Sequence, residues 1–271
     1  MEAAHHASHA AHETHELPNA ITLLNHFFPD ASWSHFIEQW ENVIFALFAS
    51  LLISFTAIRA AQKKSLVPEG LQNFWEAIVE GVEGFVTGSL GEQGTKFVPF
   101  LGALFVYILL MNWSGLIPLM KSPTSSWGTT IAVALATMVY VQYTGIREQG
   151  LGPYLKHMAG NPSNMFGLAL IPLMLVINLT VEFLAVPLSL SLRLFANVSS
   201  EDRLLYKFAE LTVLFKGLPF FFQLFANVLA IAFSMVQAFV FMLLSTVYIS
   251  LILPHDHGHE EGAEAAHAHG H

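Results

Sequence analysis

Two long apolar stretches, residues 165 to about 198 and about 205 to 253, constrain the fold of this chain more than any other feature of its sequence. Each exceeds the roughly 20 residues that a helix needs to cross the hydrocarbon core of a bilayer directly. The chain is 54% hydrophobic and 11% charged, whereas soluble domains carry about 25% charged residues. A large soluble helical core would need surface charges that are missing here. We therefore predict an all-α polytopic membrane protein.

Three shorter apolar segments complete the predicted spans: residues 42–58, 97–118 and 129–146. With them the chain has about five transmembrane helices. Each of the two long stretches either holds more than one element or forms a long tilted helix. The candidate bends are Pro172, Pro187, Gly217 and Pro219.

The segments around the spans are amphipathic or rich in histidine. Residues 69–90 carry apolar side chains at helical spacing, with three glutamates elsewhere on the helix, and this predicts an amphipathic surface helix. The segment FFPDASWSHFIEQW, residues 27–40, predicts a short amphipathic helix with aromatic residues at the interface. We divide the chain into a His-rich extracytoplasmic tail with an interfacial segment, a membrane domain, and a His-rich disordered C-terminal tail: residues 1–41, 42–253 and 254–271.

The distribution of lysine and arginine predicts the orientation in the membrane. Residues 1–58 contain neither, whereas the following loop is flanked by Arg59, Lys63, Lys64 and Lys96. Because cytoplasmic loops are enriched in these residues, we expect the N-terminus outside and, after five spans, a cytoplasmic C-terminus. The N-terminus lacks the positive charge and apolar core of a signal peptide, so the first span is expected to be an uncleaved anchor.

The composition excludes several classes of function. The chain has no cysteine, which rules out disulfides, cysteine-ligated zinc and thiol catalysis. Its 11 lysines and arginines form no basic stripe, so nucleic-acid binding is not expected. The Gly-rich phosphate loop G-x-x-x-x-G-K-[ST] is absent. We expect a chain that binds no nucleotide and no cofactor.

Glu182 and Arg193 are the only charged residues between positions 165 and 200. On a regular helix their separation of 11 residues places them about 20° apart around the axis and roughly 16 Å apart along it. They share a face but cannot pair, and Asn178, Ser189 and Asn197 lie on or near that face. Polar stripes on membrane helices face a protein interior or a water-filled path, not lipid.

The last apolar stretch repeats this pattern without charge. Six polar residues fall within about 40° of one line on a regular helix: Gln223, Asn227, Ser234, Gln237, Ser245 and Tyr248. Amide and hydroxyl side chains also join helices in membranes, so a structural role for this stripe stays open. The two stripes together predict a site or path between two helices.

Arg193 needs a carboxylate partner, because a charge inside the membrane costs at least a few kcal/mol. No acidic residue lies three or four positions away, and Glu201 and Asp202 fall just past the expected end of the helix. The partner must come from another helix or another chain at least part of the time. An arginine stays charged, so beside a carboxylate that comes and goes it would act as an electrostatic gate.

Three segments of this chain match a known family: LSLRLFANV, VQAFVFMLLSTVYISL, and NWSGLIP near the end of the second span. Together they resemble subunit a of the F-type ATP synthase membrane sector (the ATPase A chain family) over most of residues 42–253. The resemblance implies a stator subunit with two ion half-channels and an essential arginine against a rotating c-ring. Such a subunit couples proton translocation to ATP synthesis and is not an enzyme by itself.

The resemblance also implies partners and a location. The expected partners are the c-ring subunits, the b subunits of the peripheral stalk, the rest of the F1F0 ATP synthase, and membrane lipid. The expected ion is the proton, with Na⁺ as the alternative, because the ion is bound mainly on the ring. The expected location is a bacterial inner membrane.

Residue roles follow where the family motifs match. Arg193 corresponds to the arginine that faces the ring carboxylate, Asn197 lies beside it in the motif, and Gln237 matches a glutamine of the last helix. The other candidates for the proton path are Asn112, Asn178, Glu182, Asn227 and Ser234.

The sequence departs from the family pattern after the arginine. Many members carry an ionisable group eight or nine residues later, where Glu201 and Asp202 both fit here. We favour Glu201 as the outer relay, with Asp202 and Glu210 as alternates; otherwise all three belong to a solvated outer loop. Ala230 replaces a histidine or glutamate that many members have, so the usual outer-channel pair is altered.

Most of the 14 histidines lie in the two tails, and His-rich tracts of this kind bind Zn²⁺, Ni²⁺ or Cu²⁺ weakly. A metal-ion transporter with His-rich tails is therefore the alternative function. It would need ligands within the spans, which contain no histidine, and we predict no metal site. A non-transporting assembly subunit is a third option, but it leaves Arg193 without a role.

Overall fold

The computed structural model describes residues 19–27, 32–62, 69–117, 119–160, 165–215 and 220–253. Within them the secondary structure is helical, without a strand. Helices α4 (Glu41–Gln62) and α7 (Trp127–Gln149) cover two of the short predicted spans, and α6 (Val98–Ser114) forms most of the third but ends before residue 118. In the described part of the chain, five helical segments are long and apolar enough to cross a membrane. This confirms the prediction of an all-α polytopic membrane protein.

The two long stretches form a helical hairpin. Helix α9 (Met165–Thr180), η3 (Val181–Ala185) and α10 (Val186–Leu214) follow one another without a break, and α11 (Phe220–Ile252) returns beside them. The predicted end near residue 198 is therefore wrong, and the predicted second start near 205 lies within α10. Charged residues end the apolar run there, but the helix continues because residues 188–214 contain no glycine or proline.

Proline has different effects along this hairpin. Pro172 lies inside α9 without ending it. Pro187 follows η3, a π-helical turn. A proline lacks the N–H for the carbonyl four residues back and its ring crowds that carbonyl, and here that carbonyl belongs to Phe183 within the widened turn. The candidate bends Gly217 and Pro219 lie outside the described residues.

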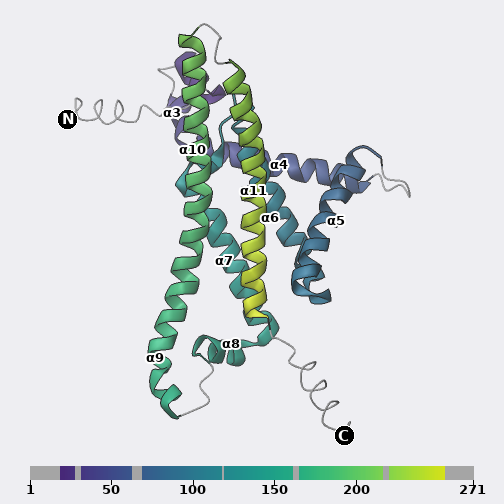
Figure 1. Cartoon of the computed structure of the whole chain (residues 1–271), viewed down its shortest axis with the longest axis vertical. Coiled ribbons are helices and arrows are strands. Elements are labelled where there is room, and N and C mark those ends of the chain that lie inside the picture. The colour runs from purple at the N-terminus through teal and green to yellow at the C-terminus, as the bar shows by residue number, and fades with distance from the viewer. Residues whose placement is uncertain are drawn as a thin grey trace, which may run out of the picture.

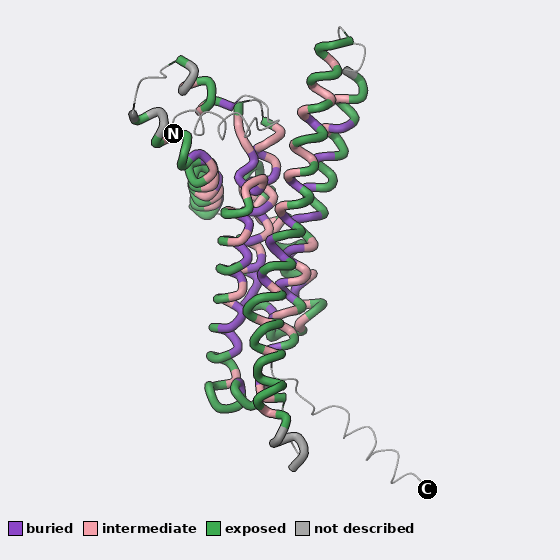
Figure 2. Tube along the Cα trace, turned by 90° about the vertical axis from the view of Figure 1, so that its left-hand side faces the viewer, coloured by how far each residue is buried: buried purple, intermediate pink, exposed green. Residues whose placement is uncertain are grey.

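Helix α4 lies across the hairpin and not parallel to it (Figure 1), and a view turned by 90° shows it nearly end-on (Figure 2). Its 22 residues extend about 33 Å, which suits an upright crossing of a hydrocarbon core of about 30 Å. The apolar segment Leu170–Leu214 has 45 residues, and its length of about 68 Å fits the same core only when steeply inclined. The arrangement thus agrees with the predicted tilt of the last two helices.

A buried core joins α6, α7, α10 and α11, and buried positions follow the facing sides of these helices (Figure 2). Its most buried members include Ile108, Met111, Ala134, Leu194 and Phe241. A second cluster adds α5 (Leu71–Leu90), whose Val82 and Val86 pack beside residues of α6 and α11. Phe74, at the start of the same helix, remains 58% exposed.

In the described residues, five short helices surround the spans. Helix η1 (Glu92–Phe97) leads directly into α6, and η2 (Pro123–Ser125) lies in the connection between α6 and α7. Helix α3 (Ser32–Gln39) agrees with the predicted interfacial helix, whereas α2 (Ala20–Phe27) and α8 (Leu151–Met158) were not predicted. Asn19 caps α2, since its Oδ1 accepts hydrogen bonds from the N–H groups of Ile21 and Thr22, each at 2.9 Å.

Candidate functional site

Arg193 lies on the exposed side of α10. Its neighbours Leu190 and Leu194 are buried in the core with residues of α6, α7 and α11. Among the described residues no carboxylate lies within ion-pair distance of its guanidinium. The carboxylate that the sequence requires is therefore not supplied by this part of the chain.

Two hydrogen bonds join α10 to α11 beyond Arg193. The amide Nδ2 of Asn197 donates to Oε1 of Gln237 at 2.6 Å. The Ser234 hydroxyl donates to the Glu201 carboxylate, at 3.1 Å from Oε1 and 3.3 Å from Oε2. Arg193, Asn197 and Glu201 are four residues apart, which places them on one side of the helix. The polar side of α10 thus leads from Arg193 along the seam with α11.

The two other candidate relays point elsewhere. A Cβ on Gly115, at the end of α6, would lie 3.3 Å from Oδ1 of Asp202, so this carboxylate packs against the connection between α6 and α7. Ser199 donates to the Ser125 carbonyl at 3.2 Å in the same connection. Glu210 is exposed and pairs with Lys207 at 2.8 Å. Glu201 and Asp202 therefore face different elements although they are adjacent in sequence.

Two buried amides carry a donor without a hydrogen-bond partner among the described residues. Nδ2 of Asn112 is one, although its Oδ1 accepts a hydrogen bond from Thr124 at 2.7 Å. Nε2 of Gln237 is the other. A buried polar group without a partner costs about 1–3 kcal/mol, and such groups in native proteins call for a functional or solvent contact.

A second polar cluster lies where α7, α8 and η3 meet. Nε2 of Gln142 donates to Oε2 of Glu182 at 3.0 Å. The Tyr154 hydroxyl donates to the carbonyl oxygen Oε1 of the same glutamine. Nδ2 of Asn178 donates to the Met158 carbonyl at 2.8 Å, which ties α9 to α8.

Gln142 and Tyr154 were not among the predicted site residues. Gln142 is a lone amide within an apolar span, and this was the available signal for it. Tyr154 lies in a segment that reads as a polar loop, so only the fold reveals its contact. Burial raises the pKa of Tyr154 to about 12, and the nearby Glu182 carboxylate adds to the rise. The phenol therefore stays protonated at neutral pH and acts as a donor.

The two clusters lie on opposite sides of Arg193 along the helix. Glu182 precedes it by roughly 16 Å and Glu201 follows it by roughly 12 Å. The π-helical turn interrupts the regular spacing from which a common face of Glu182 and Arg193 was predicted. Glu182 accordingly contacts α7, whereas Asn197 and Glu201, after Arg193, contact α11.

With this geometry in place, comparison with known proteins decides the family. The ATP synthase A chain family matches residues 43–250. The chain belongs to the ATP synthase A chain family. ATP synthase subunit a of Protochlamydia amoebophila is 42% identical over 254 residues, which cover 91% of this chain and 91% of that protein. ATP synthase subunit a of Solidesulfovibrio magneticus is 41% identical over 217 residues, which cover 80% and 86%.

Membership of the ATP synthase A chain family confirms the predicted resemblance over most of the chain. Together with the five apolar helices it identifies a multi-pass membrane protein of ATP synthesis and proton transport. The departure at Ala230 has a structural counterpart. Ala230 is buried with Ala226 of α11 and Leu205 of α10, and Glu201 bonds to Ser234 one turn further on.

The remaining predictions for this family member are the polar stripe on α11 and the absence of a metal site. Asn227 is half-buried, whereas Ser234, Gln237 and Ser245 are buried, so the second stripe faces the protein. The Ser245 hydroxyl bonds within its own helix, to the Phe241 carbonyl, and this bond does not join α11 to another helix. In the described ranges no three His, Cys, Asp or Glu side chains gather as a metal site, and the tails lie outside them.

Proposed function

We propose that this chain is the stator subunit of the ATP synthase membrane motor and that Arg193 separates two ion half-channels beside a rotating c-ring. The observation that supports this most directly is the exposed position of Arg193 between two polar clusters. The adjoining side of α10 is packed in the core through Leu190, Leu194 and Val198. Polar groups thus approach Arg193 along α10 from both directions.

Arg193 acts on the ring electrostatically. Its guanidinium cannot lose a proton in a protein, and a nearby positive charge favours the ionised form of a carboxylate. A ring carboxylate that approaches Arg193 therefore releases its proton to one half-channel. The fixed charge also prevents the arginine from relaying a proton itself, so protons cross only when the ring turns.

The two polar clusters are assigned to separate half-channels. The outer half-channel consists of residues of α10, α11 and the end of α6, with Asp202 as an alternate relay beside them: Asn112, Asn197, Glu201, Asn227, Ser234 and Gln237. Glu201 is its relay, a choice supported by its bond to Ser234 and by its position on the same side of α10 as Arg193. Glu182 and Asn178 belong to the inner half-channel.

The remaining assignments concern partners and orientation. The chain meets the c-ring with the Arg193 side of α10 and the b subunits of the peripheral stalk partly through α5. Its N-terminus is outside and its C-terminus is in the cytoplasm of a bacterial inner membrane. The chain moves protons, or Na⁺, and the nucleotide chemistry takes place on other subunits of the F1F0 complex.

The test is inhibitor-sensitive, ATP-driven proton pumping in inverted vesicles that carry Arg193→Ala. We expect pumping to fall by roughly 100-fold or more, because preorganised charge of this kind contributes that much to a step. The amount of assembled complex, checked by blot, should stay unchanged. Arg147→Ala, at the end of α7, is the matched control and should pump normally. Pumping by Arg193→Ala at a near wild-type rate would overturn the proposal.

A further inference from the structure

Among the described residues, the Glu182 carboxylate accepts a hydrogen bond from one side chain, and Glu182 lines a cavity. Its Oε2 accepts from Gln142 at 3.0 Å. Glu182 and Gln142 both line a cavity of about 160 Å³ between α7, η3, α10 and α11, which has room for several waters. Tyr248 of α11 lines the same cavity and is a further titratable group beside Glu182 and Tyr154.

The direction of the Gln142 amide is fixed at both of its ends. A glutamine has an acceptor oxygen and a donor NH2, and only the second can bond an ionised carboxylate. The Tyr154 hydroxyl donates to the oxygen end, so the NH2 end must point to Glu182. With a protonated phenol at one end and a carboxylate at the other, the flipped amide would place its oxygen against Glu182 and its NH2 against a donor.

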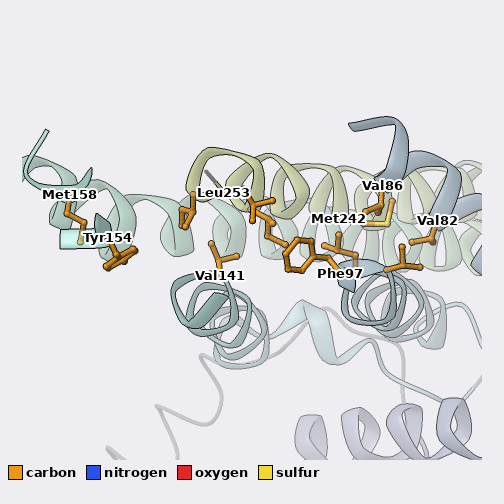
Figure 3. Close-up of a cluster of buried hydrophobic side chains, with 12 residues drawn as sticks. Val82, Val86, Phe97, Val141, Tyr154, Met158, Met242 and Leu253 are labelled. Carbon is orange, nitrogen blue, oxygen red and sulfur yellow. The ribbon is translucent and has the colours of Figure 1, made fainter. Parts of the chain in front are cut away.

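The fold holds Tyr154 in place from several sides. Its ring is 5% exposed and belongs to a buried cluster with Val141 of α7 and Leu253 after α11, as Figure 3 shows. A Cβ on Gly145 would come within 3.1 Å of this ring, so the ring approaches α7 where the helix has no side chain. The bond from Asn178 to the Met158 carbonyl anchors the far end of α8. Helix α8 therefore presents a fixed donor to Gln142.

We propose that Gln142 and Tyr154 are positioning residues, which hold the Glu182 carboxylate toward the cavity in the state that exchanges protons. The inference rests on the proposed function, because it assigns these residues to the inner half-channel. Tyr154 acts only through Gln142, and Gln142 acts only through Glu182. Neither side chain transfers the proton itself.

The experiment uses the assembled complex in inverted vesicles and follows ATP-driven pumping and its pH profile. The variants are Glu182→Gln, Gln142→Leu, Tyr154→Phe and the double variant Gln142→Leu/Tyr154→Phe. We expect pumping to fall about tenfold in Gln142→Leu and about threefold in Tyr154→Phe, the range that single hydrogen bonds support. The double variant should pump no less than Gln142→Leu alone, since the tyrosine acts through the glutamine.

The pH profile separates positioning from packing. It should move in Gln142→Leu and in Tyr154→Phe, because each variant changes the hydrogen bonding of the carboxylate that exchanges protons. Tyr143→Phe is the matched control: its ring is 59% exposed on α7, directly after Gln142, and neither its rate nor its profile should change. If the double variant lost pumping by the product of the two single losses, Tyr154 would not act through Gln142. If the pH profile of pumping did not move in either single variant, the positioning role would be overturned.

The failure of this inference is distinguishable from failure of the proposed function. If Arg193→Ala and Glu182→Gln stop pumping while Gln142→Leu and Tyr154→Phe pump as wild type, the inference alone is overturned. If Arg193→Ala pumps at a near wild-type rate, the proposed function is overturned, and with it the inference that rests on it. Blots for assembled complex accompany every variant, so a folding defect is read separately from a loss of pumping.

Discussion

At the level of single residues, adjacent carboxylates on α10 have different surroundings. Glu201 accepts a hydrogen bond from Ser234 on α11, whereas Asp202 packs at Gly115 beside the connection after α6. Adjacent helical positions point about 100° apart, so only one of the two can share the side of Arg193 and Asn197. This difference supports the choice of Glu201 as the outer relay under the proposed function.

Glu201→Gln and Asp202→Asn test this difference as a matched pair. Each keeps the size of the side chain and removes its ability to ionise. We expect ATP-driven pumping to fall about tenfold or more in Glu201→Gln, since proton transfer by a positioned group contributes at least that much. Asp202→Asn should change the rate less than threefold on the same scale. A larger loss in Asp202→Asn would assign the outer relay to Asp202.

At the level of helices, the sequence sufficed for the elements whose apolar runs end where the helix ends. Residues 42–58, 97–118 and 129–146 correspond to α4, α6 and α7. α10 did not follow that rule, because hydropathy marks where a helix leaves lipid and not where its hydrogen bonding stops. The absence of glycine and proline from residues 188–214 was the better signal for the length of α10, since those residues end helices. Helix α8 escaped prediction although Leu151, Tyr154, Leu155 and Met158 follow helical spacing, because its glycine and proline residues are typical of a loop.

The candidate site was predictable in part for the same reason. Arg193 and Glu182 stand out as charges in apolar sequence, and Gln237 lies on a visible stripe. The pairings of Glu182 with Gln142 and of Asn197 with Gln237 each join residues 40 positions apart. Periodicity places a residue on a face of its own helix, but the partner depends on how helices pack and on the π-helical turn that shifts their faces.

Gly145 tests the packing between α7, α8 and α11. A Cβ there would clash with Ile252 and press on the Tyr154 ring, so Gly145→Ala should lower the stability of the purified complex by about 1–3 kcal/mol, as overpacking does. Gly152→Ala in α8 is the matched control, because nothing lies within 4 Å of its Cβ position. Since alanine favours a helix over glycine by up to about 1 kcal/mol, the control should be neutral or stabilising. The measurement is thermal release of this chain from the complex, and equal melting temperatures for both variants would contradict this close packing.

At the level of the whole molecule, helix α4 has the length of an upright crossing, whereas the hairpin is too long for one. Helix α4 runs across α10 and α11 (Figure 1), so no single direction of the bilayer normal can be parallel to all three. An inclined hairpin brings a long side of α10 along the membrane plane. A rotating ring carboxylate travels in that plane, so the arrangement lets it pass the inner cluster, Arg193 and the outer cluster in turn under the proposed function.

The same arrangement predicts which ends of the hairpin reach which side of the membrane. The chain has no cysteine, so a single introduced cysteine reports without background from this subunit. Phe215, after α10, and Leu151, at the start of α8, are 54% and 65% exposed. We expect a membrane-impermeant maleimide to label Phe215→Cys only from outside intact cells and Leu151→Cys only in inverted vesicles, because lysine and arginine place the N-terminus outside. The unsubstituted complex controls for cysteines on other subunits. The reverse pattern would invert the orientation and exchange the two half-channels, whereas labelling of both positions from one side would contradict a hairpin that crosses the membrane.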